Sequence, residues 1–264
     1  MKTSITTIDR LKGWGQRLLA LVFWLLVWQA AAWAMNSFLL PGPWTVAENL
    51  WALCRTGDFW RSIFLSFGRI ALGFVLAVGV GTLLAILCHG SGWLRVFVAP
   101  LMTVIKATPV ASFIILALVF LRSAWLSVFI SFLMVLPVVF VNVTQGLSEV
   151  DPQLREMARV FRLGWRQRIR GLYLPSVMPY FFSACTVGLG FCWKAGIAAE
   201  VIGLPDFSIG ERLYEAKINL NMGEMLAWTV TIVCISLVME RLVFYLMERV
   251  RRRWQDGSHS RKTV

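Results

Sequence analysis

The stretch Ile70–Cys88 has the sequence IALGFVLAVGVGTLLAILC and contains no charged side chain. Backbone N–H and C=O groups in lipid must pair within their own segment, so an apolar run of about 20 residues predicts a membrane-spanning helix. The composition agrees: 58% of the 264 residues are hydrophobic and 15% are charged, whereas about a quarter of a soluble domain is charged. The sequence therefore indicates an all-α integral membrane protein.

Five further stretches are apolar and long enough, or nearly so, to cross a bilayer, which predicts six transmembrane helices in a single domain covering 1–264. The six predicted spans are Leu18–Ala34, Ile70–Cys88, Val96–Leu121, Trp125–Val143, Val177–Gly196 and Met225–Met247. The first could instead be a secretory signal. Its apolar stretch is longer than a typical signal core and contains three bulky tryptophans, so a span is the better interpretation.

The net charge of +12 would suggest a nucleic-acid partner in a soluble chain. In a membrane chain, basic residues collect in cytoplasmic loops instead. Most of the 26 Lys and Arg fall at the two ends of the chain and between the fourth and fifth predicted spans. We therefore expect a multi-pass protein of the cell (inner) membrane with both termini in the cytoplasm, contacts with membrane lipid and no nucleic-acid partner.

Small residues recur every fourth position in two predicted spans. The ridges are Gly73, Ala77, Gly81, Ala85 and Ala184, Gly188, Cys192, Gly196. Such ridges allow close approach of helix backbones in lipid, so both helices are expected inside the bundle. Pro100 and Pro109 in the third span, and Pro137 in the fourth, should kink these helices or open their backbone.

The loop between the fourth and fifth spans, about 148–175, is polar and contains six arginines. Asp151 and Pro152 are placed like the N-cap and first residue of a short helix. The apolar residues that can share one side of this loop are Leu154, Met157, Ala158, Phe161 and Leu172. They predict an apolar ridge with a basic rim. A basic helix resting on anionic lipid headgroups is the alternative.

The residues Glu156, Met157, Ala158 and Leu172, Tyr173, Leu174, Pro175 resemble the signature E-A-A-x3-G-x9-I-x-L-P of permease subunits of binding-protein-dependent ABC importers. The glycine of that signature is Arg162 here, with Gly164 two residues later. The segments Leu40–Pro43, Ala107–Pro109 and Ala198–Gly203 extend the resemblance over most of the chain. Together they look most like the nitrate, sulfonate, taurine and bicarbonate subgroup.

The resemblance implies an ATP-driven importer whose permease moves a small, anionic solute inward by alternating access. Its expected partners are a separate ATP-binding subunit, which would hold ATP and Mg²⁺, a second permease copy and an extracytoplasmic solute-binding protein. The loop would be the coupling helix that docks on the ATP-binding subunit. The residues expected to couple are Glu156, Met157, Ala158, Phe161, Arg162, Gly164, Leu172, Leu174 and Pro175.

Enzyme chemistry is not expected on this chain. It has no GxxxxGK[ST] phosphate-binding loop, and its two histidines and five cysteines form no motif for a metal, a disulfide or a catalytic triad. A self-contained secondary transporter of a small anion is the competing function, but the spans contain almost no Asp or Glu for a proton relay. We expect no cofactor and no metal bound by the chain itself.

Polar groups within the spans are the candidates for the translocation pathway. A charge at the bilayer centre costs about 2.5–3.5 kcal/mol, so each needs a partner, a wet cavity or a route to the interface. The candidates are Lys106, Thr108, Asn142, Lys194 and Glu200. Two lysines facing the pathway would favour an anion. Each residue also has a structural alternative: snorkelling for the lysines, packing for Thr108 and Asn142, and helix capping for Glu200.

Overall fold

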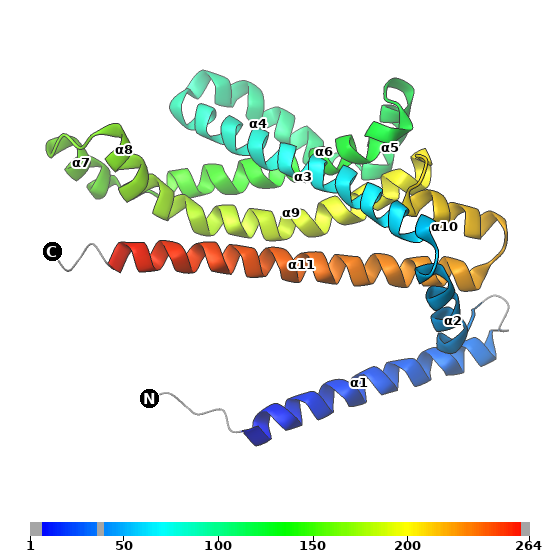
Figure 1. Ribbon diagram of the computed structural model, residues 1–264. Helices are drawn as coiled ribbons and strands as arrows, with labels where there is room; N and C mark the ends of the chain where they lie inside the picture. The colour runs from blue at the N-terminus through cyan, green and yellow to red at the C-terminus, as the bar shows by residue number, and fades with distance from the viewer. Residues whose placement is uncertain (1–6, 36–39, 260–264) are drawn as a thin grey trace. The chain divides into compact units, whose positions relative to one another are not determined.

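The computed structural model describes residues 7–35 and 40–259, and every regular element in those ranges is helical (Figure 1). The all-α fold predicted from the sequence is thus confirmed. The elements are α1 Thr7–Ala34, α2 Pro43–Cys54, α3 Gly57–Gly90, α4 Gly92–Ala107, α5 Val110–Phe120, α6 Ser123–Ser148, α7 Pro152–Val160, α8 Trp165–Arg168, the π-helical turn η1 Ile169–Tyr173, α9 Leu174–Gly203, α10 Ile209–Ile218 and α11 Met222–His259.

The chain divides into two compact units. The first comprises the residues up to Phe59 together with Leu213–Thr231, and the second comprises Trp60–Arg212 and the residues from Ile232 onward. In the first unit, Phe59 packs against the buried Trp228 with ring centroids 5.0 Å apart. Reciprocal hydrogen bonds between Asn221 and Glu224 cap the start of α11.

Four helical segments in the described ranges are long and apolar enough to cross a membrane: Gly57–Gly90, Ser123–Ser148, Trp165–Gly203 and Met222–Tyr245. The apolar part of α1, Leu18–Ala34, is a shorter helix of 17 residues at the lower limit for a span. The sixth candidate is the pair formed by α4 and α5. The count of six spans therefore stays a prediction.

The third predicted span, Val96–Leu121, is broken. Helices α4 and α5 are bent by 107° relative to each other at Thr108 and Pro109. A residue that precedes proline is pushed out of the helical region, and Thr108 is accordingly extended at ψ 131°. Pro109 is the N-cap of α5, whereas Pro100 lies inside α4 without ending it. Of the two prolines, only Pro109 opens this backbone.

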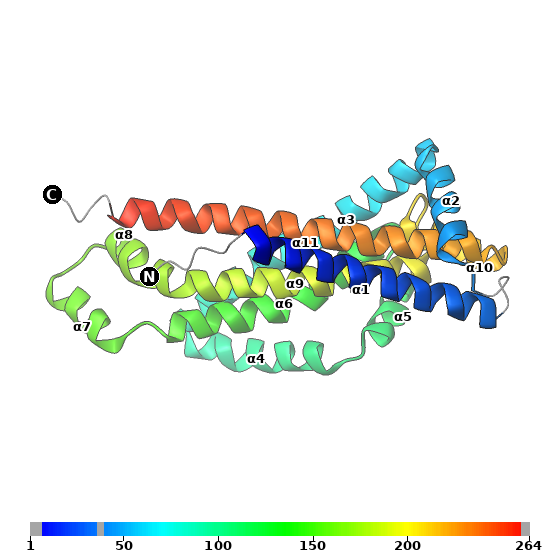
Figure 2. The same ribbon diagram turned by 90° about the horizontal axis from the view of Figure 1, so that it is seen from below.

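Helix α6 is the centre of the second unit, and both small-residue ridges pack against it. Ala77 on α3 and Ala184 on α9 are fully buried. A Cβ atom at Gly73 would overlap the Val128 carbonyl of α6, and one at Gly196 would lie 2.6 Å from Ser131 Oγ. These close approaches show that both ridges are buried packing faces. Most of the remaining surface of α3 is exposed, so an interior position for the whole of α3 stays a prediction. Figures 1 and 2 show α6 and α9 running side by side.

The second half of the loop after α6 runs directly into α9. The elements α8, η1 and α9 form one helical segment, Trp165–Gly203, which continues through Pro175. Proline lacks an N–H and clashes with the carbonyl four residues earlier. The π-helical turn immediately before Leu174 widens the backbone at this position, so Pro175 is accommodated in the first turn of α9.

Candidate functional site

Helix α7 begins as the sequence predicts. Asp151 is its N-cap, with its carboxylate accepting a 2.8 Å hydrogen bond from the backbone N–H of Gln153, and Pro152 is its first residue. The helix ends at Val160, and the N–H of Leu163 closes the turn by donating to the Ala158 carbonyl at 3.0 Å. The loop is therefore ordered by local contacts of its own.

The apolar residues of the loop divide into two groups. Ala158 and Leu172 are buried with Val150 in a small core, against which Leu163 and Tyr173 pack. The predicted single ridge is wrong in this respect, because these two residues point inward. The apolar side chains that remain exposed form what we call the loop surface: Leu154, Met157, Val160, Phe161 and Trp165.

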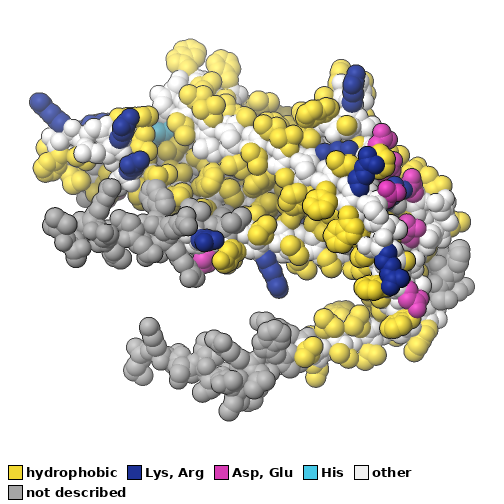
Figure 3. All heavy atoms as spheres, in the orientation of Figure 1, with side chains coloured by type: hydrophobic (Ala, Val, Ile, Leu, Met, Phe, Trp, Pro, Cys, Tyr) yellow, Lys and Arg dark blue, Asp and Glu magenta, His cyan; other side chains and the backbone are white. Residues whose placement is uncertain are grey.

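Exposed basic residues alternate along the chain with the residues of the loop surface. Arg159, Arg162, Arg166 and Arg170 are exposed, as is Glu156. Figure 3 shows hydrophobic and basic side chains side by side at the end of the visible face where α7 and α8 lie. An apolar centre with a charged rim is the usual anatomy of a surface that binds another protein.

Arg162 has a left-handed backbone conformation, with φ of 49°. This is the position of the signature glycine, and the conformation is the one glycine adopts without strain. Gly164 does not replace it, because Gly164 has φ of −61° and precedes α8. The turn after α7 therefore has a backbone conformation that suits a glycine, although its residue is arginine.

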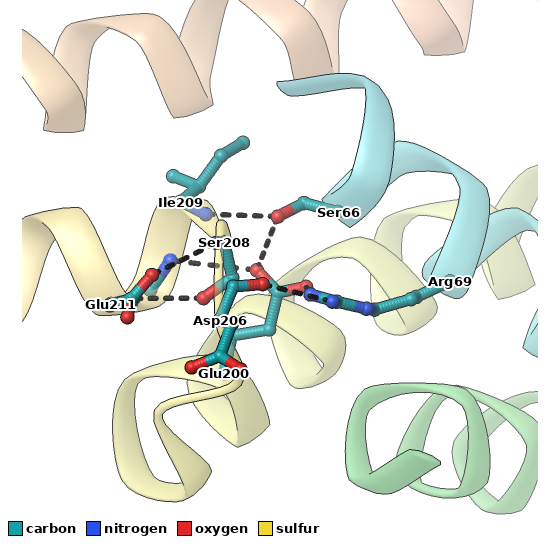
Figure 4. Close-up of polar contacts among 8 residues, drawn as sticks. Ser66, Arg69, Glu200, Asp206, Ser208, Ile209 and Glu211 are labelled. Atoms are coloured by element: carbon teal, nitrogen blue, oxygen red, sulfur yellow. Dashed lines mark hydrogen bonds and ion pairs between the residues drawn. The ribbon is translucent and has the colours of Figure 1, made fainter. Parts of the chain in front are cut away.

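A buried polar cluster lies at the other end of α9, among Ser66, Arg69, Glu200, Ile209 and Gly210 (Figure 4). The Glu200 carboxylate is fully buried and accepts a 2.6 Å hydrogen bond from the Ser66 hydroxyl. Gly210 N–H donates to the same oxygen at 3.5 Å, and Ile209 N–H donates to Ser66 Oγ at 2.9 Å. Arg69 Nη1 lies 3.8 Å from the other carboxylate oxygen.

The turn between α9 and α10 is fixed by further contacts. Leu204 and Phe207 have left-handed backbones, and Arg69 Nη2 donates to the Asp206 carbonyl at 3.0 Å. The guanidinium of Arg61 lies over the Phe207 ring at 3.6 Å. Ser208 and Glu211 hydrogen-bond each other's backbone N–H and cap α10.

The five pathway candidates are not brought into one site. Lys106, in the last turn of α4, and Lys194, on α9, are both exposed. Thr108 Oγ1 donates to the Val104 carbonyl and Asn142 Nδ2 to the Val138 carbonyl, each at 2.8 Å within or beside its own helix. Within 7–35 and 40–259, no hydrogen bond or ion pair joins any two of the five.

Sequence reasoning missed two sets of residues. Ser66 and Arg69 precede Glu200 by more than 130 positions, so the sequence does not place them together. The one signal for a pair was that Arg69 and Glu200 carry opposite charges and each lies near the end of a predicted span. Val160 and Trp165 also belong to the loop surface.

No group of three or more His, Cys, Asp or Glu that could hold a metal occurs in the described part of the chain.

Residues 77–255 match the model of the binding-protein-dependent transport system inner membrane component family, which covers α6, the loop and α9. The chain belongs to this family. It is thus a transmembrane permease subunit of an ABC importer, and it contains both the loop surface and the polar cluster.

Two relatives of this permease match along most of their length. The nitrate import permease protein NrtB of Synechocystis is 27% identical over 237 residues, 86% of this chain and 86% of that protein. The permease SsuC of Bacillus subtilis, assigned to aliphatic sulfonates transport, is 25% identical and covers 93% of this chain and 89% of its own length. The subgroup indicated by the sequence is confirmed by these relatives.

A solved structure shows the same fold for this permease. An amino acid ABC transporter crystallised with histidines superimposes with a TM-score of 0.58 at 18% identity, over 74% of this chain and 93% of that chain. At this level of identity the similarity supports the fold alone.

Proposed function

We propose that this permease works as a dimer of two copies in the cytoplasmic membrane and imports a small anion, driven by ATP hydrolysis on a separate subunit. A solute-binding protein would deliver the anion from outside. In this arrangement both termini and the loop 148–175 lie in the cytoplasm. The observation that carries the proposal is the loop surface, since five large apolar side chains stay exposed on an otherwise polar, arginine-rich segment.

The loop surface supports docking on an ATP-binding subunit. Phe161 and Trp165 are 72% and 77% exposed, so burial against a partner would remove most of their apolar area from water. The surrounding arginines can pair with acidic residues of the partner and fix the register. Glu156, Arg162 and Gly164 would line the contact, while Ala158, Leu172, Leu174 and Pro175 would hold the loop and its junction with α9.

The proposed orientation requires α4 and α5 to act as one broken span. If the pair entered and left on the same side, α6 would run in the opposite direction and the arginine-rich loop would lie outside. The excess of basic residues in this loop and at both ends of the chain favours the cytoplasmic side for all three. The 107° bend then lies within the membrane, where an opened backbone is tolerated if it lines a cavity.

An anionic solute is supported by two independent observations. Relatives of this chain are named for nitrate and aliphatic sulfonates, both of which are anions. Lys106 and Lys194 are exposed within the protomer, so both are available to a pathway between two copies. Lys106 also lies in the last turn of α4, next to the helix break, and no side chain caps the N-terminus of α5. Thr108 and Asn142 would shape the wall, because their side-chain donors are already used.

Docking is tested by copurification of the ATP-binding subunit with Phe161→Ser. We expect about tenfold less bound subunit, since a central aromatic contact is typically worth more than 1 kcal/mol. The matched control is Phe120→Ser, which removes an equally exposed phenylalanine, 79%, on α5. Equal recovery with both variants would show that the loop surface is not the docking site. A chain that transports without any ATP-binding subunit would exclude the proposed function.

A further inference from the structure

The Glu200 carboxylate joins three elements at the end of α9. Through one oxygen it holds Ser66 of α3 and the Gly210 N–H of α10, and through Ser66 it also holds the Ile209 N–H. Figure 4 shows these contacts converging between the ribbon of α3 and the first turn of α10. The first turn of α10 is therefore tied to α3 by a side chain of α9.

The second carboxylate oxygen of Glu200 forms an ion pair with Arg69 but no hydrogen bond. It lies 3.8 Å from Arg69 Nη1, whereas charge-assisted hydrogen bonds are about 2.7–2.9 Å long. Both atoms are buried, and neither has a hydrogen-bond partner among the residues that the structure describes. Arg69 is held in this position because its other terminal nitrogen donates to the Asp206 carbonyl at 3.0 Å.

We propose that Glu200 is a positioning residue for transport, whose ion pair with Arg69 is too long for a hydrogen bond in this structure and shortens to a hydrogen-bonded pair during the transport cycle. The hydrogen bonds of one Glu200 oxygen with Ser66 and Gly210 stay fixed and form a pivot, while a small rotation of α3 about Ser66 changes the distance from Arg69 to the other oxygen. This inference rests on the proposed function, because it assumes an ATP-driven change at the loop end of α9.

The length of the Arg69–Glu200 ion pair distinguishes a contact that changes during transport from a fixed structural contact. A buried ion pair whose facing atoms lack a hydrogen bond is costly, and a purely structural contact would gain by shortening. A rotation of α3 about Ser66 that moves Arg69 Nη1 by about 1 Å would bring Nη1 and Oε1 to ordinary hydrogen-bond distance. The cluster therefore has two available arrangements that differ by a small movement, which is the requirement for a conformational switch.

The first measurement is hydrogen–deuterium exchange on the permease with its ATP-binding subunit, in nanodiscs, with and without ATP. In the wild type we expect ATP to change the exchange of residues 203–210. Glu200→Gln keeps an oxygen that can accept from Ser66 but removes the charge that attracts Arg69. It should keep basal protection of Ile209 and Gly210 within about twofold, and lose the ATP-dependent change.

The second measurement is solute moved per ATP hydrolysed in proteoliposomes with the binding protein, using nitrate and ethanesulfonate in parallel. Glu200→Gln and Arg69→Gln should each lower this ratio at least about fivefold while basal ATPase stays within about twofold. The double variant should be no worse than Arg69→Gln alone, because Glu200→Gln then has no Arg69 contact left to remove. Asp206→Asn is the matched control, since its side chain is exposed and only its carbonyl is used.

Three outcomes would overturn the inference. A Glu200→Gln variant with the wild-type ratio would show that the Arg69 contact does not participate. Loss of basal protection together with all activities would indicate a purely structural residue. Additive losses in the double variant would show that the two residues act separately. If the wild type neither binds the ATP-binding subunit nor hydrolyses ATP with it, the proposed function fails first, and this inference fails with it.

Discussion

At the scale of single residues, the turn after α7 carries a conformational cost. Arg162 has φ of 49°, where an L-residue with a Cβ is disfavoured by about 1–2 kcal/mol relative to the right-handed region. The conformation is maintained because the Arg162 and Leu163 N–H groups donate to the carbonyls of Arg159 and Ala158. These bonds satisfy two carbonyls at the end of the helix.

Arg162→Gly should stabilise this turn. Glycine adopts the left-handed conformation without a Cβ penalty, although it loses more backbone entropy on folding, so we expect a net gain of about 0.5–1 kcal/mol. Slower hydrogen exchange of the Leu163 amide would record the gain. Arg166→Gly, in α8, is the control and should destabilise its helix, because α8 has right-handed backbone angles. Faster exchange at Leu163 in the Arg162 variant would contradict this account.

The partners of individual residues are the least predictable part of the molecule. The sequence identifies Glu200 as a polar residue at a span end, but its contacts with Ser66 and Arg69 depend on how α3 and α9 meet. Arg162 is a similar case, because its conformation is normally signalled by a glycine that this chain lacks. Asp151 is the opposite case, since a cap depends only on residues next to it.

At the scale of helices, small residues determine where α3, α6 and α9 touch. Gly73 approaches the backbone of α6 at Val128, whereas Gly79, less than two turns later on the same helix, has no atom within 4 Å of the position a Cβ would occupy. The two glycines therefore have different roles, although both lie in the same apolar stretch.

Gly73→Ala should destabilise the second unit by about 1–3 kcal/mol, because the added methyl group would overlap the α6 backbone. Gly79→Ala should be neutral or slightly stabilising, by up to about 1 kcal/mol, since alanine is the better helix former. Thermal unfolding of the detergent-solubilised permease would compare them. Equal melting temperatures for the two variants would mean that α3 can move away from α6 at little cost.

The sequence predicts which apolar stretches form helices, but it does not predict where those helices are broken. Each of the six apolar stretches forms helix within its described residues, because an apolar segment of that length has few alternatives. The effect of each proline depended on its surroundings. Pro109 separates α4 from α5, Pro137 lies within α6, and Pro175 is accommodated after a π-helical turn. Residue type alone does not distinguish these outcomes.

At the scale of the whole molecule, Lys106 and Lys194 provide a test of the proposed anionic solute. Lys106→Met and Lys194→Met should each reduce nitrate or ethanesulfonate uptake roughly three- to tenfold at low anion concentration, because each removes a positive charge that attracts the anion. The loss should become smaller as ionic strength rises. Lys217→Met, on α10, is the control and should transport normally. Unchanged uptake in both span variants would assign these lysines to snorkelling or packing.

The helical segment Trp165–Gly203 is continuous, so a movement at one end can be transmitted to the other. Its 39 residues would span about 58 Å as a helix, roughly twice the hydrocarbon thickness of a bilayer. Such a segment acts as a lever: a tilt of about 5° at one end displaces the other by about 5 Å. A movement at Trp165, near the loop surface, would then reach Glu200 through one continuous helix. The size of the movement at Glu200 would depend on how rigid the π-helical turn Ile169–Tyr173 is.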